Sequence, residues 1–496
     1  EKGVFMESLL EKLCAYSQSE IYPFHMPGHK RNVGALGREF PNPYRIDITE
    51  VEGFDNLHHA EGILKDFMQR AAEIYGSDES FYLINGSSCG ILSAVSACVP
   101  RRGEILIARN CHKAAYYAVL QNELKAEYVY PQEIESLGIP GGILPEDVDK
   151  RLEENPDIQA VLIVSPTFDG MVSDIKKIAE NVHRRGKILI VDEAHGAHLP
   201  FGKDGDFPSS ALKNGADIVI ESLHKTLPCL TQTAILHVKK GYLTDTQMEK
   251  LKMYLSVYQS SSPSYVLMAG MEYGISFMER QGQEALARLK ERLTDFREKC
   301  RCLSEIYVPG KEIIGSFGVW DLDESKIVMM LRHHLASGKW LLDYLRSAHK
   351  LEMELCAPQY VLALTSVMDE QEGMERLFAA LCAADRKVLE NNQADALKMQ
   401  KISRYNKKGS PERALTIFDA MEQEKAVCPI AACEGKISGA FVYVYPPGIP
   451  CLVPGERITR EIILQIEEYL YLDLEVCGMA DSREYGLKVL KESVEK

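Results

Sequence analysis

The stretch ILIVDEAHG, residues 188–196, is an apolar run that ends abruptly in an acidic residue, Asp192. A second stretch of the same form, DIVIESLHK, occupies residues 217–225 and ends in Lys225. Runs of aliphatic residues without a polar face are typical of parallel strands that helices cover on both sides. One strand–helix–strand step separates the two stretches, so we expect Asp192 and Lys225 at the same edge of one sheet.

Further apolar runs extend this pattern in both directions. They occupy residues 81–84, 104–108, 127–130, 160–164 and 234–238. Segments of helical periodicity, such as 173–185, fill the longer gaps, and this alternation predicts parallel strands joined by crossover helices. The gap before 234–238 is too short for such a crossover, so we expect that strand to be antiparallel. The sequence thus predicts an α/β fold whose large domain contains a mostly parallel seven-stranded sheet.

The remaining segments predict a chain of several domains. We expect an irregular N-terminal arm at 1–60, the large domain at 61–302, a small α+β domain at 303–385, a polar linker at 386–409 and a C-terminal domain at 410–496. The large domain should end in one long charged amphipathic helix, residues 272–301. A length of 496 residues agrees with two to four domains.

Composition excludes several classes of partner. The net charge is −15, from 57 basic and 72 acidic residues, which argues against a nucleic-acid binder and against an anionic membrane surface. No apolar run approaches the roughly 20 residues that span a bilayer, and residues 1–16 alternate charged and apolar residues, unlike a signal peptide. Thirteen cysteines form no C-x-x-C pair and no regular framework. We therefore expect a cytoplasmic protein with reduced thiols and without a metal site.

Polar residues follow the predicted strands at the edge where open parallel sheets bind ligands. The sequence NGSSCG, residues 85–90, begins a helix and can hold an anion with free backbone N–H groups. His112 follows the second run, and partial burial of Lys225 would favour the neutral amine that forms imines. Taken singly, these features are equally typical of a capped helix or of a structural histidine.

Together they are the parts needed to hold pyridoxal 5'-phosphate. The helix start takes the phosphate, and the imidazole stacks on the ring. Asp192 keeps the pyridine nitrogen protonated, so that the ring can act as an electron sink. Lys225 forms the Schiff base.

The chain resembles the group III pyridoxal-phosphate decarboxylases, the ornithine, lysine and arginine decarboxylases of fold type I. The resemblance covers nearly the whole chain. It includes HMPGHK (25–30), DITE (47–50), DNLH (55–58), YPPGIP (445–450) and VPGE (453–456), besides the strand-end motifs 85–90, 109–113, 192–195 and 222–225. The arm and C-terminal motifs are the more discriminating, because D-x-A-H and S-x-H-K recur in other enzymes of this fold.

The resemblance implies a role for each motif residue. Lys225, Asp192 and His112 would be catalytic, and His195 would lie near the phenolic oxygen of the cofactor or the substrate. Ser87, Ser88, Ser222 and His224 would bind the phosphate, together with Ser260 and Ser261 of a neighbouring subunit. This implies a homodimer with shared active sites, and a higher oligomer stays open. The chain resembles the short form, without a receiver-like domain, and TLPCL (226–230) departs from the small residues that are frequent there.

The implied reaction is decarboxylation of a basic L-amino acid to a polyamine precursor, with arginine preferred over lysine and ornithine. An acidic residue should bind the distal cation of the substrate, because a buried unpaired charge is costly. The candidates are Asp47, Glu50, Asp55 and Glu456, each also typical of a helix cap or a surface charge. The alternatives are another fold type I enzyme, such as an aminotransferase or aldolase, and a catalytically silent regulatory relative. A metal-hydrolase or helicase interpretation of DEAH (192–195) lacks a phosphate-binding loop.

Overall fold

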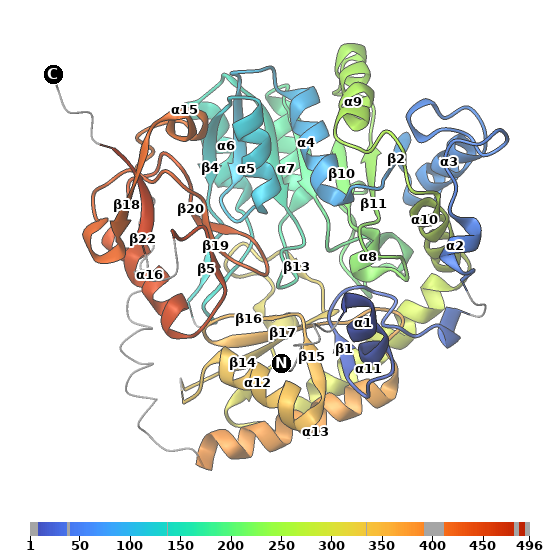
Figure 1. Cartoon of the computed structure of the whole chain (residues 1–496), viewed down its shortest axis with the longest axis vertical. Coiled ribbons are helices and arrows are strands. Elements are labelled where there is room, and N and C mark those ends of the chain that lie inside the picture. The colour runs from blue at the N-terminus through green and yellow to red at the C-terminus, as the bar shows by residue number, and fades with distance from the viewer. Residues whose placement is uncertain are drawn as a thin grey trace, which may run out of the picture.

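The computed structural model describes residues 8–36, 40–135, 137–333, 335–390, 411–480 and 486–491. Its centre is a seven-stranded sheet in the order β2-β11-β10-β9-β7-β3-β4 (Figure 1). The strands are β2 (Glu79–Leu83), β3 (Glu104–Ala108), β4 (Lys125–Val129), β7 (Ile158–Val164), β9 (Ile188–Asp192), β10 (Ile218–Glu221) and β11 (Ala234–Val238). Strand β11 runs opposite to the other six strands of this sheet, which confirms the predicted arrangement of six parallel strands and one antiparallel strand.

Helices connect these strands and pack on the sheet. They are α4 (Gly86–Cys98), α5 (Lys113–Gln121), α6 (Pro145–Glu154), α7 (Ile175–Arg184), α8 (Leu223–Thr226) and α9 (Asp245–Val257). Helix α4 lies close to the sheet because a Cβ at Gly90 would come within 2.7 Å of Leu83 Cδ1 and 3.0 Å of Ile220 Cγ2. This glycine therefore sets how near the start of α4 comes to the end of β10.

The long helix expected at 272–301 begins earlier and is interrupted. Helix α10 (Tyr265–Phe277) continues into a π-helical turn, η4 (Met278–Gly282), and then into α11 (Gln283–Cys300). Gly282 allows Phe201 to approach closely, because a Cβ added to Gly282 would lie 3.3 Å from the Cβ of Phe201. Amphipathic periodicity does not reveal a π turn, because the pattern is shifted by a single residue.

A second, antiparallel sheet lies below the first in Figure 1, in the order β12-β14-β17-β16. The elements of this region are β12 (Ile306–Tyr307), β14 (Lys326–Leu331), α12 (Gly338–His349), β15 (Leu351–Met353), β16 (Leu355–Cys356), β17 (Tyr360–Leu364) and α13 (Gln371–Glu390). Helix α13 extends past residue 385, where the linker was expected to begin, and most of that expected linker lies outside the described residues. The predicted domain boundaries stay a prediction.

The N-terminal arm and the C-terminal region flank the two sheets on opposite sides (Figure 1). The arm contains α1 (Leu9–Ser17), β1 (Tyr22–Phe24), η1 (Gly34–Leu36), α2 (Pro43–Ile46) and η2 (Leu57–His59), before α3 (Ile63–Tyr75). The C-terminal region contains α15 (Ile417–Glu422), β18 (Lys425–Pro429), β19 (Val442–Val444), β20 (Pro450–Leu452), α16 (Arg460–Tyr471), β21 (Val476–Cys477) and β22 (Gly486–Leu490). Across the residues that the structure describes, every helix is too short or too polar to cross a membrane.

Candidate functional site

The predicted site residues of the large sheet converge at the carboxyl ends of its strands. Asp192 is the last residue of β9 and pairs in register with Ile220 of β10, two residues before Ser222. His112 caps α5 after β3, and Lys225 lies in the short helix α8 after β10. The structure thus places residues that follow β3, β9 and β10 at one edge of the sheet, as parallel topology requires.

Lys225 is the partly buried amine at the centre of this group. Its Nζ lies 2.9 Å from His195 Nε2. Burial lowers the pKa of Lys225, while the carboxylates of Asp192 and Glu354 act in the opposite direction. A lysine with a lowered pKa is more often a neutral amine, which is the form that attacks a carbonyl carbon.

Asp192 is the buried acid of the site. Burial raises its pKa, and the charge of Lys225 offsets part of this effect. Its Oδ1 accepts the backbone N–H of Ala194 at 3.1 Å. A second cation next to this carboxylate, such as a protonated ring nitrogen, would keep it ionised.

His112 is held in place from two directions. Its Nδ1 accepts the backbone N–H of Ala114 at 3.2 Å, which puts the proton of the neutral ring on Nε2. On the other side, a Cβ added to Gly448 would lie 3.4 Å from Nε2, so the C-terminal motif packs directly against this imidazole. Burial, with help from the charges of Lys225 and Lys113, lowers the pKa of His112 to about 3.

The start of α4, on the same sheet, is the helix start predicted to bind an anion. The N-cap Asn85 makes no side-chain cap, so the first N–H groups of the 13-residue helix stay available. Ser87 is half-buried and Ser88 is exposed in this first turn. Ser222 is fully buried, and its Oγ has no hydrogen-bond partner among the described residues. His224 donates from Nδ1 to the carbonyl of Thr233 at 2.9 Å, and this bond fixes the orientation of its ring.

His195 lies deeper than the sequence indicated. It packs edge-on against Phe168, with 4.8 Å between ring centroids, and its carbonyl accepts a hydrogen bond from the buried Lys326 at 2.6 Å. Its Nδ1 is buried and has no partner in the described part of the chain. Burial holds the pKa of His195 well below its ordinary value, so the ring is neutral and in contact with Lys225.

These groups fit pyridoxal phosphate. A free helix start and the unpartnered hydroxyl of Ser222 suit a phosphate, because a buried hydroxyl without a partner is costly unless a ligand satisfies it. The buried carboxylate of Asp192 suits a ring nitrogen, and Lys225 suits the aldehyde. The unusual segment after the lysine removes none of these groups, since Leu227 and Cys229 are buried in the core and Cys229 packs against Gly274.

The two serines expected from a neighbouring subunit are exposed in this chain. Ser260 Oγ donates to the carbonyl of Ser262, and the Ser260 carbonyl lies 2.7 Å from His58 Nε2. Ser261 is also exposed on the same loop. Their exposure leaves them available to a partner molecule.

The four acidic residues expected to bind the distal cation of the substrate differ in exposure and in hydrogen bonding. Asp47 and Glu50 are exposed on the arm. Asp55 accepts backbone N–H groups from Asn56, Glu61, Gly62 and Leu64, and these bonds lower its pKa, as expected of the cap alternative. Glu456 is 1% exposed and is paired with Arg109, with 3.1 Å between Oε2 and Nη2. The Asp55 carboxylate is thus engaged by backbone N–H groups and the Glu456 carboxylate by Arg109, while Glu456 Oε1 has no partner among the described residues.

Glu354 is the acidic residue that the sequence did not reveal. It lies just before β16, and its Oε2 accepts the backbone N–H of Met26 at 2.9 Å. Burial raises its pKa, and Lys30 and Lys225 lower it, so the carboxylate lies near both lysines. In the sequence LEMEL (351–355), alternation puts Glu352 and Glu354 on one polar face, which is typical of solvent-facing residues.

Family comparison covers both the large sheet and the C-terminal region. Residues 7–334 match the Orn/Lys/Arg decarboxylase major domain, and residues 397–475 match the C-terminal domain of the same family. An arginine decarboxylase of Halalkalibacterium halodurans is 30% identical over 488 residues, which cover 98% of this chain and 97% of the relative. An arginine decarboxylase of Bacillus subtilis is 31% identical and covers 97% of each chain.

More distant relatives share the fold. The inducible lysine decarboxylase of Escherichia coli is 24% identical over all of this chain and 82% of its own. The structure of lysine decarboxylase A from Pseudomonas aeruginosa superposes with a TM-score of 0.76 at 19% identity, over 98% of this chain and 84% of that one. A ureidoglycine–glyoxylate aminotransferase of B. subtilis reaches a TM-score of 0.56 at 12% identity, over 78% of this chain and 99% of the aminotransferase.

Proposed function

The chain belongs to the Orn/Lys/Arg decarboxylase family, and from this membership we propose that it decarboxylates L-arginine. The family depends on pyridoxal phosphate and acts on basic amino acids. The preference for arginine is supported by identity of 30 and 31% with arginine decarboxylases over nearly the full length, against 24% with a lysine decarboxylase.

The observation that carries the proposal is the convergence of Lys225, Asp192 and His112 at one sheet edge. Lys225 would hold the cofactor, Asp192 would face its ring nitrogen and His112 its ring. The phosphate would bind at the start of α4, with Ser87, Ser88, Ser222 and His224. When bound, pyridoxal phosphate would supply an electron sink for the electron pair that stays on the α-carbon when carbon dioxide leaves.

The protein's own groups then supply the proton that the α-carbon needs. Lys225 Nζ is the amine at the centre of the site, and His195 Nε2 lies 2.9 Å from it. We assign to Lys225 the delivery of that proton, and to the neutral ring of His195 the hydrogen bond that orients the Lys225 amine. Phe168 packs edge-on against the His195 ring, which reduces the access of water to that side of the site.

Glu354 is our candidate for the distal cation of the substrate. It is an acid whose charge lies close to Lys225, and it enters the site from the second sheet rather than from the large one. A guanidinium or ammonium group placed between the two sheets would pair with the Glu354 carboxylate, which would offset the cost of burying either charge.

A substrate comparison tests this proposal. Glu354→Gln should lower kcat/KM for arginine by about a hundredfold, mostly through KM, because a buried charge pair typically costs about 2–5 kcal/mol when one partner is lost. The matched control is Glu352→Gln, two residues away in an ion pair with the half-exposed Arg346. Steady-state carbon dioxide release from arginine, lysine and ornithine should rank arginine first for the wild type. Equal kcat/KM for Glu354→Gln and Glu352→Gln would show that Glu354 does not bind the distal cation. Faster carbon dioxide release from lysine or ornithine than from arginine would contradict arginine as the substrate.

We also propose a homodimer in which Ser260 and Ser261 reach the phosphate of the partner's site. Their exposure in this chain supports that arrangement. A cytoplasmic location with reduced cysteines remains part of the proposal, and titration of the denatured protein should count thirteen thiols per chain.

A further inference from the structure

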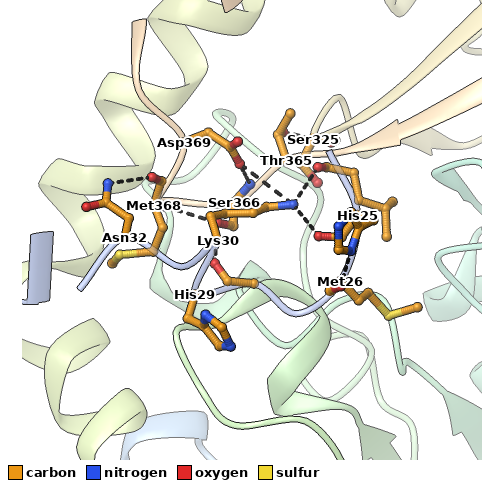
Figure 2. Close-up of polar contacts among 12 residues, drawn as sticks. His25, Met26, His29, Lys30, Asn32, Ser325, Thr365, Ser366, Met368 and Asp369 are labelled. Carbon is orange, nitrogen blue, oxygen red and sulfur yellow. Dashed lines mark hydrogen bonds and ion pairs between the residues drawn. The ribbon is translucent and has the colours of Figure 1, made fainter. Parts of the chain in front are cut away.

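The motif HMPGHK, residues 25–30 and here called the arm loop, surrounds a buried lysine. Figure 2 shows the Lys30 side chain extended toward the carbonyl of His25 and the carboxylate of Asp369. Lys30 Nζ donates to the carbonyls of His25 and Leu364, both at 2.8 Å, and lies 4.0 Å from Asp369 Oδ2. Lys30 is 6% exposed, so this ammonium group ties the arm firmly to the turn that follows β17.

Gly28 joins the same loop to the helix that carries Lys225. Its N–H donates to the carbonyl of His224 at 2.7 Å, and its own carbonyl accepts the hydroxyl of Ser366 at 2.6 Å. A Cβ at this position would lie 2.6 Å from the carbonyl oxygen of Leu227, which is closer than a side chain can approach. Only glycine lets the loop pack this tightly against α8.

Met26 gives the loop a third contact, because its N–H holds Glu354. Six consecutive residues therefore touch α8, the acid before β16 and the turn between β17 and α13. Helix α8 follows a strand of the large sheet, whereas the other two parts adjoin strands of the second sheet (Figure 1). None of the catalytic roles assigned above uses this loop.

We propose that the arm loop is a positioning element that fixes Lys225 relative to Glu354, with Gly28 as its contact residue and Lys30 as its anchor. The inference rests on the proposed function, since it concerns the lysine that would hold the cofactor. A displacement of about 1 Å at a reacting group can cost on the order of a hundredfold in rate, so a rigid link between the sheets has a direct catalytic consequence.

A pair of glycine variants tests the contact. Gly28→Ala forces the loop away from Leu227, whereas Gly34→Ala lies in the same arm, where the nearest atom is 3.9 Å from the added Cβ. Hydrogen exchange of the peptide covering residues 222–228, measured with and without pyridoxal phosphate, should be about tenfold faster in Gly28→Ala than in Gly34→Ala. With arginine, kcat should fall about a hundredfold, while KM changes far less.

Lys30→Met keeps the test decisive if Gly28→Ala fails to fold. It retains the aliphatic stem and removes the donors, and its control is Arg297→Met, another buried cation, which bonds the carbonyls of Pro309, Glu324 and Lys326. We expect faster exchange at 222–228 and a lower kcat for Lys30→Met but not for Arg297→Met. Unchanged exchange at 222–228, or faster exchange with kcat within about twofold of the control, would overturn the positioning role. A wild type that binds no cofactor would instead refute the proposed function, while the exchange comparison would still decide whether the arm loop holds α8.

Discussion

Burial determines the protonation state of the histidines around Lys225. It lowers the pKa of His112 to about 3 and that of His224 to about 4, and it holds the pKa of His195 well below its usual range. Three neutral imidazoles therefore surround the amine at neutral pH. A neutral ring can stack on a cofactor or accept a proton without adding a positive charge beside Lys225.

Stability at acidic pH tests the burial of His112. In the unfolded chain its pKa would be near 6.5, so below that pH the unfolded state binds a proton that the folded state does not. Stability is then lost as the pH falls from about 6.5 toward the folded pKa. We expect the unfolding free energy of the wild type to fall between about pH 6.5 and pH 5. In urea unfolding of the cofactor-free protein, the unfolding free energy of His112→Phe should fall by about 1–2 kcal/mol less over the same range.

The exposed His59 supplies the control for this measurement. Its ring is 83% exposed, so His59→Phe makes the same chemical change at an exposed position instead of a buried one. Loss of the His112 cap shifts the unfolding free energy of His112→Phe by the same amount at every pH. Parallel curves for His112→Phe and the wild type would contradict a buried, neutral His112.

At the scale of elements, sequence patterns predicted the strands of the large sheet well. Strands β3 and β11 begin and end where the apolar runs do, and β9 differs by one residue at its end. Local periodicity carries this information because each strand is buried on both faces. The strands β12 and β16 have only two residues each, which is too short for a recognisable sequence pattern. Glu354 was not predicted as a site residue because apolar and acidic residues alternate around it, as they do on a strand with one face toward solvent.

We expect the ion pair between Arg109 and Glu456 to hold the C-terminal region against the large sheet. Arg109 also donates to the carbonyls of Pro450 at 2.6 Å and Cys451 at 3.3 Å, which join the end of β3 to β20. Glu456→Gln leaves a buried guanidinium without its counter-charge and should cost about 3–5 kcal/mol of unfolding free energy. Glu461→Gln, an exposed acid in the first turn of α16, should change it by no more than about 0.5 kcal/mol. Equal stability of the two variants in urea unfolding would contradict a structural role for the pair.

For the whole molecule, the sequence predicted the large sheet and which of its strand ends carry Lys225, Asp192 and His112, but not how the two sheets meet. Lys225, Asp192 and His112 could be predicted because strand ends of one parallel sheet share an edge. The arm loop connects that sheet to the second one through backbone hydrogen bonds of Met26 and Gly28. Backbone hydrogen bonds between distant segments leave no pattern in a sequence. The family resemblance indicated that residues 25–30 matter without indicating what they touch.

Shared sites predict complementation between defective chains. In a hybrid of Lys225→Ala and a Ser260→Ala, Ser261→Ala chain, one site carries both defects and the other carries neither. Co-expressed chains should therefore decarboxylate arginine faster than the average of the two parent dimers, and light scattering should give twice the mass of the 55.7 kDa chain. Activity equal to that average, or a monomeric mass, would contradict the proposed dimer.

The most direct test of the central claim is borohydride reduction of the wild type and Lys225→Ala after incubation with pyridoxal phosphate, followed by peptide mass spectrometry. We predict a visible absorbance in the wild type, a cofactor adduct on the peptide that contains Lys225, and carbon dioxide release from arginine. Lys225→Ala should carry no adduct on that peptide, and its release should fall on the order of a thousandfold or more. A wild type that stays colourless with excess pyridoxal phosphate, or an adduct on a different lysine, would contradict the account.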